Sequence, residues 1–149
     1  MSPGNAARLR VLLVEDNPGD IDLVAEALRE LPCDLSVALD GVTALEALRA
    51  SAPGPGARTP DLILLDLNLP RMDGREVLAS LKRDPALLHI PVVVLSSSRA
   101  ERDLLDTYRM HANCFVTKPV DLERFLSSVA AVARFWFEVV SLPTATHVW

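Results

Sequence analysis

Three acidic side chains and one lysine each follow a short apolar run of the chain. Asp66 follows the run LILL, and Glu15 and Asp16 follow the run VLLV. Lys118 follows the residues FVT. Short, continuously apolar runs are typical of strands buried in a parallel sheet, and open α/β sheets keep their ligand sites at the carboxyl ends of the strands. We therefore expect these four side chains to meet at one edge of one sheet.

An acidic cluster with a lysine beside it suits an aspartate that accepts a phosphoryl group. Like charges at this density require a cation or a raised pKa on one of the acids, and oxygen ligands alone select a hard ion such as Mg²⁺. Lys118 can pair with Asp66 at rest and with a phosphoryl oxygen later. Ser96 ends the apolar run VVVL, so its hydroxyl can donate to the same oxygens. Ser97 and Ser98 follow, which leaves the serine assignment open by one residue.

Each of these residues also has a purely structural explanation. Glu15 and Asp16 alone fit a solvated acid pair at the start of a helix. Lys118 alone fits a surface lysine before a turn, and Ser96 alone fits a turn serine. Their joint placement at matching strand ends is what favours a chemical site.

Five predicted strands alternate with amphipathic helices. Asn17 and Pro18 fit the cap and first residue of one helix, and Asp121 fits the cap of the last. Strands separated by helices run parallel, and right-handed crossovers favour a flavodoxin-like α/β fold. We expect a (βα)5 three-layer sandwich around a five-stranded parallel sheet with strand order 2-1-3-4-5. The predicted strands are residues 10–15, 34–39, 61–66, 91–96 and 113–117. The predicted helices are residues 18–30, 74–83 and 100–111, with two more beginning near 41 and 121.

Composition describes one globular domain. The chain has 149 residues, half of them hydrophobic, with a mean hydropathy of +0.23 and a net charge of −5. This acidic balance argues against a general nucleic-acid or anionic-membrane surface. The apolar segment 125–142 carries Arg134 and Glu138, which fits an amphipathic helix better than a membrane span. Cys33 and Cys114 lack metal-type spacing and fit a reducing cytoplasm.

The ordered set of residues resembles the receiver domains of two-component response regulators. The resemblance runs from about residue 9 to 133 and includes the segment LNLPRMDG at residues 67–74. It implies that Asp66 is the phosphoacceptor and that Lys118 binds the phosphoryl group. Ser96 would be the hydroxyl of the conformational switch, and Phe115 its aromatic residue. Many receivers have tyrosine at that position, whereas phenylalanine cannot donate a hydrogen bond.

The same resemblance implies a Mg²⁺ site. Asp16, the Asp66 carboxylate and the main-chain carbonyl of Asn68 would bind the ion, with Glu15 acting through water. We expect self-phosphorylation from phosphohistidine and autodephosphorylation, without turnover of an independent substrate.

A narrower likeness concerns the kinase partner. The segments EDNPGD, NCFVTKP and FWFEVVSLP, with the proline-rich loop at residues 51–60, resemble regulators that partner phytochrome-type histidine kinases. A bacteriophytochrome kinase is therefore the expected partner.

The chain divides into a receiver domain at residues 9–134 and a C-terminal extension at 135–149, with no output domain expected. Phe135, Val139 and Leu142 form an apolar line that one core cannot cover, next to Trp136. We expect these residues to form a homodimer interface. The alternative is an extension folded back on its own subunit.

Four alternative functions are compatible with parts of this pattern. An aspartyl-phosphate hydrolase needs a second acid two residues after the nucleophile, where this chain has Asn68. A flavodoxin-like carrier needs a phosphate-binding loop after the first strand, where Glu15 and Asp16 would repel phosphate. A receiver-fold module that works without phosphorylation stays open, as does a phosphate sink or shuttle in a phosphorelay.

Overall fold

A single parallel sheet forms the centre of the molecule. The structure is a computed structural model, and it describes residues 8–51, 59–96, 114–118 and 121–139. The sheet has five strands in the order β2-β1-β3-β4-β5, as predicted. The strands are β1 (Leu9–Val14), β2 (Cys33–Ala38), β3 (Leu62–Asp66), β4 (Val92–Ser96) and β5 (Cys114–Thr117). All four strand pairs are parallel.

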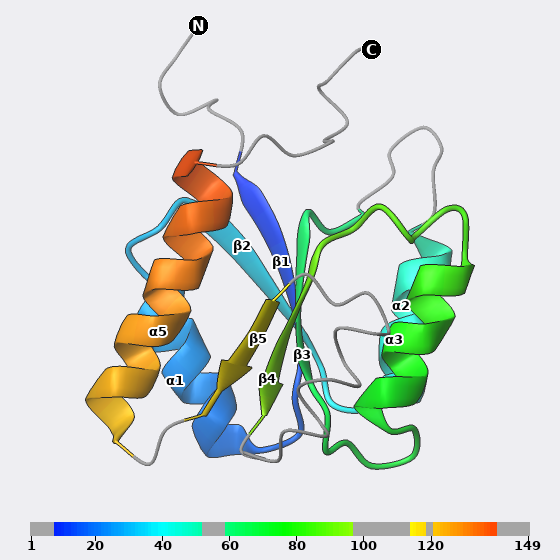
Figure 1. The fold of residues 1–149 in the computed structure, drawn as a ribbon, viewed down its shortest axis with the longest axis horizontal. Helices are drawn as coiled ribbons and strands as arrows, with labels where there is room; N and C mark the ends of the chain where they lie inside the picture. Colours follow the sequence, from blue (N-terminus) through cyan, green and yellow to red (C-terminus); the bar gives the residue numbers. More distant parts are fainter. Residues whose placement is uncertain (1–7, 52–58, 97–113, 119–120, 140–149) are drawn as a thin grey trace, which may run out of the picture.

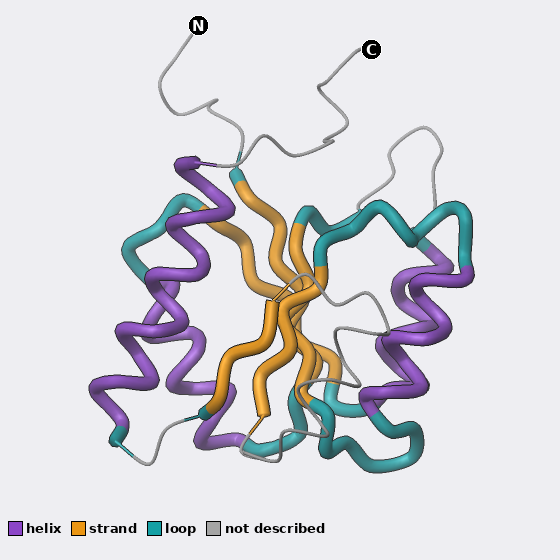
Figure 2. Tube along the Cα trace, in the orientation of Figure 1, coloured by secondary structure: helices purple, strands orange, loops and turns teal. Residues whose placement is uncertain are grey.

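Helices cover both faces of this sheet, which gives the expected three layers (Figure 1). One face carries α1 and α5, which pack against each other, and the other carries α2 and α3. Figure 2 shows the strands as one layer between these two helix pairs. The helices are α1 (Pro18–Leu28), α2 (Gly41–Ala50), α3 (Gly74–Arg83) and α5 (Leu122–Arg134). The helix predicted at residues 100–111 lies outside the described residues.

Alternating strand residues fill two separate cores. In β3, Ile63 and Leu65 face the core under α2 and α3, whereas Leu62 and Leu64 face the core under α1 and α5. β1 and β4 divide in the same way. Because side chains alternate along a strand, burial on both faces requires the continuous apolar runs seen in the sequence. The same burial leaves the strand ends as the place where polar side chains emerge.

Polar caps fix the helix starts. Asn17 accepts a hydrogen bond from the backbone N–H of Asp20 and caps α1, with Pro18 as the first helical residue, as predicted. Asp121 caps α5 by accepting from the N–H of Glu123, also as predicted. α1 ends at Leu28, two residues before its predicted end.

The last helix changes its winding at the predicted start of the C-terminal extension. α5 continues into a π-helix at Phe135–Val139. The Phe135 side chain is 50% exposed, whereas Trp136 and Phe137 pack against the core under α1 and α5. The Val139 side chain and Leu142 lie outside the described residues. Within the described ranges, no helix is long and apolar enough to cross a membrane.

Candidate functional site

Neighbouring strands bring the three predicted carboxylates together. β1 pairs with β3 so that Val14 lies opposite Leu65, which places Glu15 and Asp66 at the same edge of the sheet. Carboxylate oxygens of Glu15, Asp16 and Asp66 lie within 4.8 Å of one another. Glu15 and Asp66 are buried and Asp16 is exposed. A set of three carboxylates, open to solvent on one side, has the donor chemistry that a hard divalent cation requires.

Lys118 reaches this cluster from the end of β5. Its Nζ lies 3.0 Å from Oε2 of Glu15 and 3.6 Å from Oδ2 of Asp66. The predicted pairing with Asp66 is present, although it is the longer of these two contacts. Only 12% of the Lys118 side chain is exposed. The sheet therefore holds a largely desolvated positive charge against the predicted phosphoacceptor.

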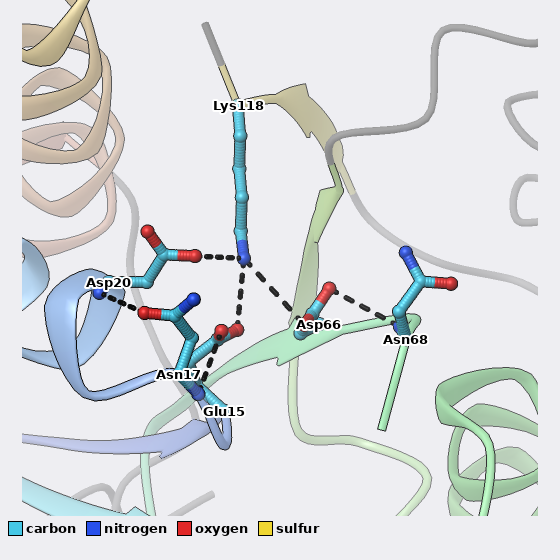
Figure 3. Close-up of polar contacts among 6 residues, drawn as sticks. All are labelled: Glu15, Asn17, Asp20, Asp66, Asn68 and Lys118. Atoms are coloured by element: carbon cyan, nitrogen blue, oxygen red, sulfur yellow. Dashed lines mark hydrogen bonds and ion pairs between the residues drawn. The ribbon is translucent and has the colours of Figure 1, made fainter. Parts of the chain in front are cut away.

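Asp20 also contacts Lys118, although it was not among the predicted site residues. Its Oδ2 lies 2.9 Å from Nζ of Lys118, the shortest of the three carboxylate contacts that the described residues make with this ammonium (Figure 3). Asp20 lies in the first turn of α1, three residues after the cap Asn17. Acidic residues in the first turn of a helix interact favourably with the helix dipole, so an aspartate at this position did not by itself indicate a functional site. Only its position could have pointed to the site, because α1 begins shortly after Glu15, which follows the end of β1.

The pKa values of Glu15 and Lys118 are both raised, which favours the neutral form of the acid and the charged form of the base. Burial, together with the neighbouring Asp66, raises the pKa of Glu15 from 4.5 to about 8. Burial alone would lower the pKa of Lys118, but its hydrogen bond to Asp20 and the two other carboxylates outweigh burial and raise that pKa. Glu15 therefore holds a proton readily, while Lys118 keeps its charge.

Ser96 ends the neighbouring strand at the same edge. β4 pairs with β3 so that Asp66 lies opposite Leu95, one residue before Ser96. Ser96 is fully buried, and its carbonyl accepts a 2.7 Å hydrogen bond from the backbone N–H of Lys118. The backbone thus links two of the predicted site residues directly. The side chain of Phe115, the predicted switch aromatic, lies outside the described residues.

The loop after β3 shapes the other side of Asp66. Oδ1 of Asp66 accepts a 3.3 Å hydrogen bond from the backbone N–H of Asn68. The Asn68 side chain points away from Lys118 (Figure 3). The N–H of Gly74 donates to the carbonyl of Leu67 at 2.9 Å, which closes the loop onto α3. One carboxylate oxygen of Asp66 is thereby held by the backbone, while the other faces the lysine.

Residues 11–130 match the response regulator receiver domain family. The chain belongs to this family. It is 44% identical to the response regulator Rcp1 of Synechocystis sp., over 91% of this chain and 93% of Rcp1. Its fold matches the crystal structure of the phosphorylated cyanobacterial phytochrome response regulator RcpA with a TM-score of 0.86 and 45% identity, over 93% and 100% of the two chains. The Mn²⁺-bound form of Rcp1 matches with a TM-score of 0.83 and 43% identity, over 91% and 99%.

These similarities confirm the two resemblances predicted from the residues. The chain is a receiver-domain response regulator of two-component signalling, and it is close to phytochrome response regulators. Receiver proteins of this family act in signalling and are not turnover enzymes.

Proposed function

We propose that Asp66 accepts a phosphoryl group from a phosphohistidine on a histidine kinase. The observation that carries this proposal is the placement of Asp66. Its carboxylate is buried at the strand end, contacts Lys118 at 3.6 Å and lies within 4.8 Å of two further carboxylates. Phosphoryl transfer demands positioning and charge neutralisation more than covalent chemistry from the protein, and this site offers both.

The acidic cluster fits Mg²⁺. Glu15, Asp16 and Asp66 offer only carboxylate oxygens, and we place the ion there, with the main-chain carbonyl of Asn68 as a further ligand. Glu15 would act on the ion through water. When bound, Mg²⁺ supplies positive charge for the transferring phosphoryl oxygens.

The transfer exchanges one bond for another at phosphorus. An oxygen of Asp66 forms the new P–O bond while the P–N bond to the kinase histidine breaks, and the electron pair of that bond stays on the imidazole. Lys118 neutralises oxygens of the arriving group, and the Ser96 hydroxyl donates to one of them. Water later cleaves the acyl phosphate and returns the Asp66 carboxylate. Phe115 would follow Ser96 in the resulting switch, with an apolar ring in place of a tyrosine.

A phytochrome-type kinase is the proposed partner. The names of the related proteins support this, since RcpA is described as a phytochrome response regulator and a further relative, AtBRR, as a bacteriophytochrome response regulator. AtBRR is 40% identical to this chain over 93% of it, with a TM-score of 0.68. Because such kinases draw their phosphate from ATP, we place the exchange in the cytoplasm.

We also propose that two copies of the chain pair through the C-terminal extension. The receiver domain spans residues 9–134 and the extension 135–149 in this division. Half of the Phe135 ring surface is open to solvent at the end of α5, and its ring stacks edge-on against Trp136 with centroids 5.7 Å apart. Exposed aromatic surface of this kind supports an interface, to which Val139 and Leu142 would contribute.

Labelling with a small phosphodonor tests the assignment of Asp66. The purified protein is incubated with acetyl phosphate and Mg²⁺, and its intact mass is measured. We expect a phosphate-sized gain in the wild type and none in Asp66→Asn. Asp61→Asn is the matched control, because Asp61 precedes the same strand at the opposite edge of the sheet, where it accepts from the N–H of Arg10. Labelling of Asp66→Asn at the wild-type level would refute the assignment.

A negative result has a defined meaning as well. If the folded wild type gains no phosphate with Mg²⁺ present, transfer from a phosphorylated phytochrome-type kinase is tested next. Failure there would favour a receiver module that works without phosphorylation. Transfer onward from labelled protein to a second histidine protein would instead identify a phosphate shuttle.

A further inference from the structure

Among the described residues, Asp20 forms the shortest contact with Lys118, although it was not one of the predicted site residues. Nζ of Lys118 lies 2.9 Å from Asp20, 3.0 Å from Glu15 and 3.6 Å from Asp66. These three carboxylates surround the ammonium from three different elements, the start of α1, the end of β1 and the end of β3 (Figure 3). The phosphoacceptor is therefore the most distant of the three partners.

The helix does not need the Asp20 side chain for its own cap. An acid three residues after a cap often reaches back to the N–H of the capping residue. Here that N–H, on Asn17, lies instead 3.4 Å from Oε1 of Glu15, to which it donates. Asp20 takes part in the cap through its backbone N–H, which donates to Asn17. Its carboxylate is left to face Lys118, with 29% of the side chain exposed.

We propose that Asp20 is a positioning residue that holds Lys118 in a resting position and competes with the phosphoryl group for its ammonium. This inference rests on the function proposed for Asp66. When Asp66 is phosphorylated, its single charge is replaced by a group of about −2, with oxygens closer to the lysine. Lys118 then moves toward those oxygens, and the contact with Asp20 is lost or lengthened.

Asp20 disfavours the phosphorylated form in two ways. The ion pair with Lys118 stabilises the resting site, and the Asp20 carboxylate adds negative charge beside the incoming phosphoryl group. Removing its charge while keeping its shape should release Lys118 toward Asp66. The steady-state phosphorylated fraction should then rise, because loading becomes faster relative to loss.

The test compares loading and loss of phosphate in four proteins. Wild type, Asp20→Asn, Asp20→Glu and Asp22→Asn are labelled with acetyl phosphate at one pH and saturating Mg²⁺, and intact mass follows loading and then loss after the donor is removed. Asp22 is the matched control, since it is an exposed acid on the same helix. We expect the ratio of the loading rate to the loss rate to rise at least about fivefold in Asp20→Asn, since fivefold is the upper size of a solvent-exposed ion pair and this pair is mostly buried. The ratio should stay near wild type in the other two variants.

A second background shows whether Asp20 acts through Lys118. The Asp20→Asn change is repeated in Lys118→Ala, with longer incubation to follow slower loading. The rise should disappear there. An equal rise in that background would overturn the proposal, because Asp20 would then act by its field alone. An unchanged or lower ratio in Asp20→Asn would overturn it as well.

Two controls distinguish the role of Asp20 from a folding defect and from a failure of the function proposed for Asp66. Thermal unfolding of each variant is checked first, and Asp20→Ser replaces Asp20→Asn if the latter does not fold, since serine is also accepted in a first helical turn. A wild type that is never labelled at Asp66 contradicts the proposed function itself. A wild type that is labelled normally, with Asp20→Asn equal to Asp22→Asn, contradicts only the role of Asp20.

Discussion

The backbone of Gly74 packs so closely against the backbone of Asp66 that no side chain fits between them. A Cβ on Gly74 would collide with the carbonyl oxygen of Asp66 and lie 2.6 Å from Cα of Leu67. These neighbours are main-chain atoms, which cannot turn away as a flexible side chain can. Gly74, the first residue of α3, thus determines how closely the helix approaches the end of β3 that carries the proposed phosphoacceptor.

Gly74→Ala should therefore destabilise the fold and displace Asp66 together. Overpacking of this kind costs about 1–3 kcal/mol, and we expect a loss in the upper part of that range in urea unfolding. Labelling of Asp66 by acetyl phosphate should slow in the same variant. Gly19→Ala is the control, because its Cβ would meet only the side-chain Oδ1 of Asn17, at 3.2 Å. Equal unfolding free energies for the two variants would contradict this account of Gly74.

The raised pKa of Glu15 predicts an unusual pH dependence of stability. Burial and Asp66 raise that pKa from 4.5 to about 8, so the folded protein binds this proton more tightly than the unfolded chain does. The stabilisation is complete below pH 4.5 and is lost as the pH rises through about 8. In metal-free protein, the unfolding free energy should fall across this window by an amount on the order of a few kcal/mol.

Chemical unfolding at several pH values in the presence of a chelator measures this slope. Glu15→Gln is the control that removes the titrating group while keeping its shape, so its slope should be flatter over the same range. Mg²⁺ should also flatten the slope in the wild type, because a bound cation favours the charged carboxylates at high pH. If the slope is as steep in Glu15→Gln as in the wild type, another titrating group causes the pH dependence of stability.

Strand ends were predictable because burial dictates them. β3 lies between helix layers on both sides, so its sequence is apolar until Asp66, and the run itself marks the strand end. The contact of Asp20 with Lys118 was not predictable in the same way. The two residues are 98 positions apart, and their contact depends on the direction of two side chains at the end of different elements.

The π-helix at the end of α5 shows a second limit. The apolar segment 125–142 predicted an amphipathic helix, and α5 with the π-helix that follows it confirms this as far as Val139. The π-helix is only five residues long, so its wider turn changes the spacing of the apolar residues too little to be detected in the sequence. It decides, however, which aromatic rings face the core and which face solvent. Trp136 is partly buried and Phe135 is half exposed, although both were predicted as interface residues.

Arg71 adopts a left-handed backbone conformation in the loop after β3, with φ of 65°. Its guanidinium pairs with Asp40 at 3.2 Å, but 60% of the side chain is exposed, so that pair contributes little. Arg71→Gly and Arg71→Ala both remove the pair, and only glycine relieves the backbone strain. We expect the glycine variant to be more stable than the alanine variant by about 1 kcal/mol in urea unfolding.

Arg75 provides the matched comparison for that prediction. It lies in the first turn of α3, where alanine is still preferred over glycine, so Arg75→Gly should be less stable than Arg75→Ala by roughly 0.5 kcal/mol. The sign of the difference between glycine and alanine should therefore reverse between two arginines four residues apart. The same sign at both positions would contradict a strained backbone at Arg71.

Phe135 is the described residue best suited to test the proposed homodimer, because it is half exposed at the start of the extension. If Phe135 lies at the centre of the interface, Phe135→Ser should weaken self-association at least about tenfold, since buried aromatic anchors dominate interface energies. Sedimentation equilibrium over a range of concentrations measures this constant. Leu88→Ser is the matched control, an apolar side chain of similar exposure, 48%, in the segment between α3 and β4. The dimer constant should not change in that variant. A wild type that stays monomeric, or an equal loss in both variants, would refute the proposed interface and favour an extension folded back on its own subunit.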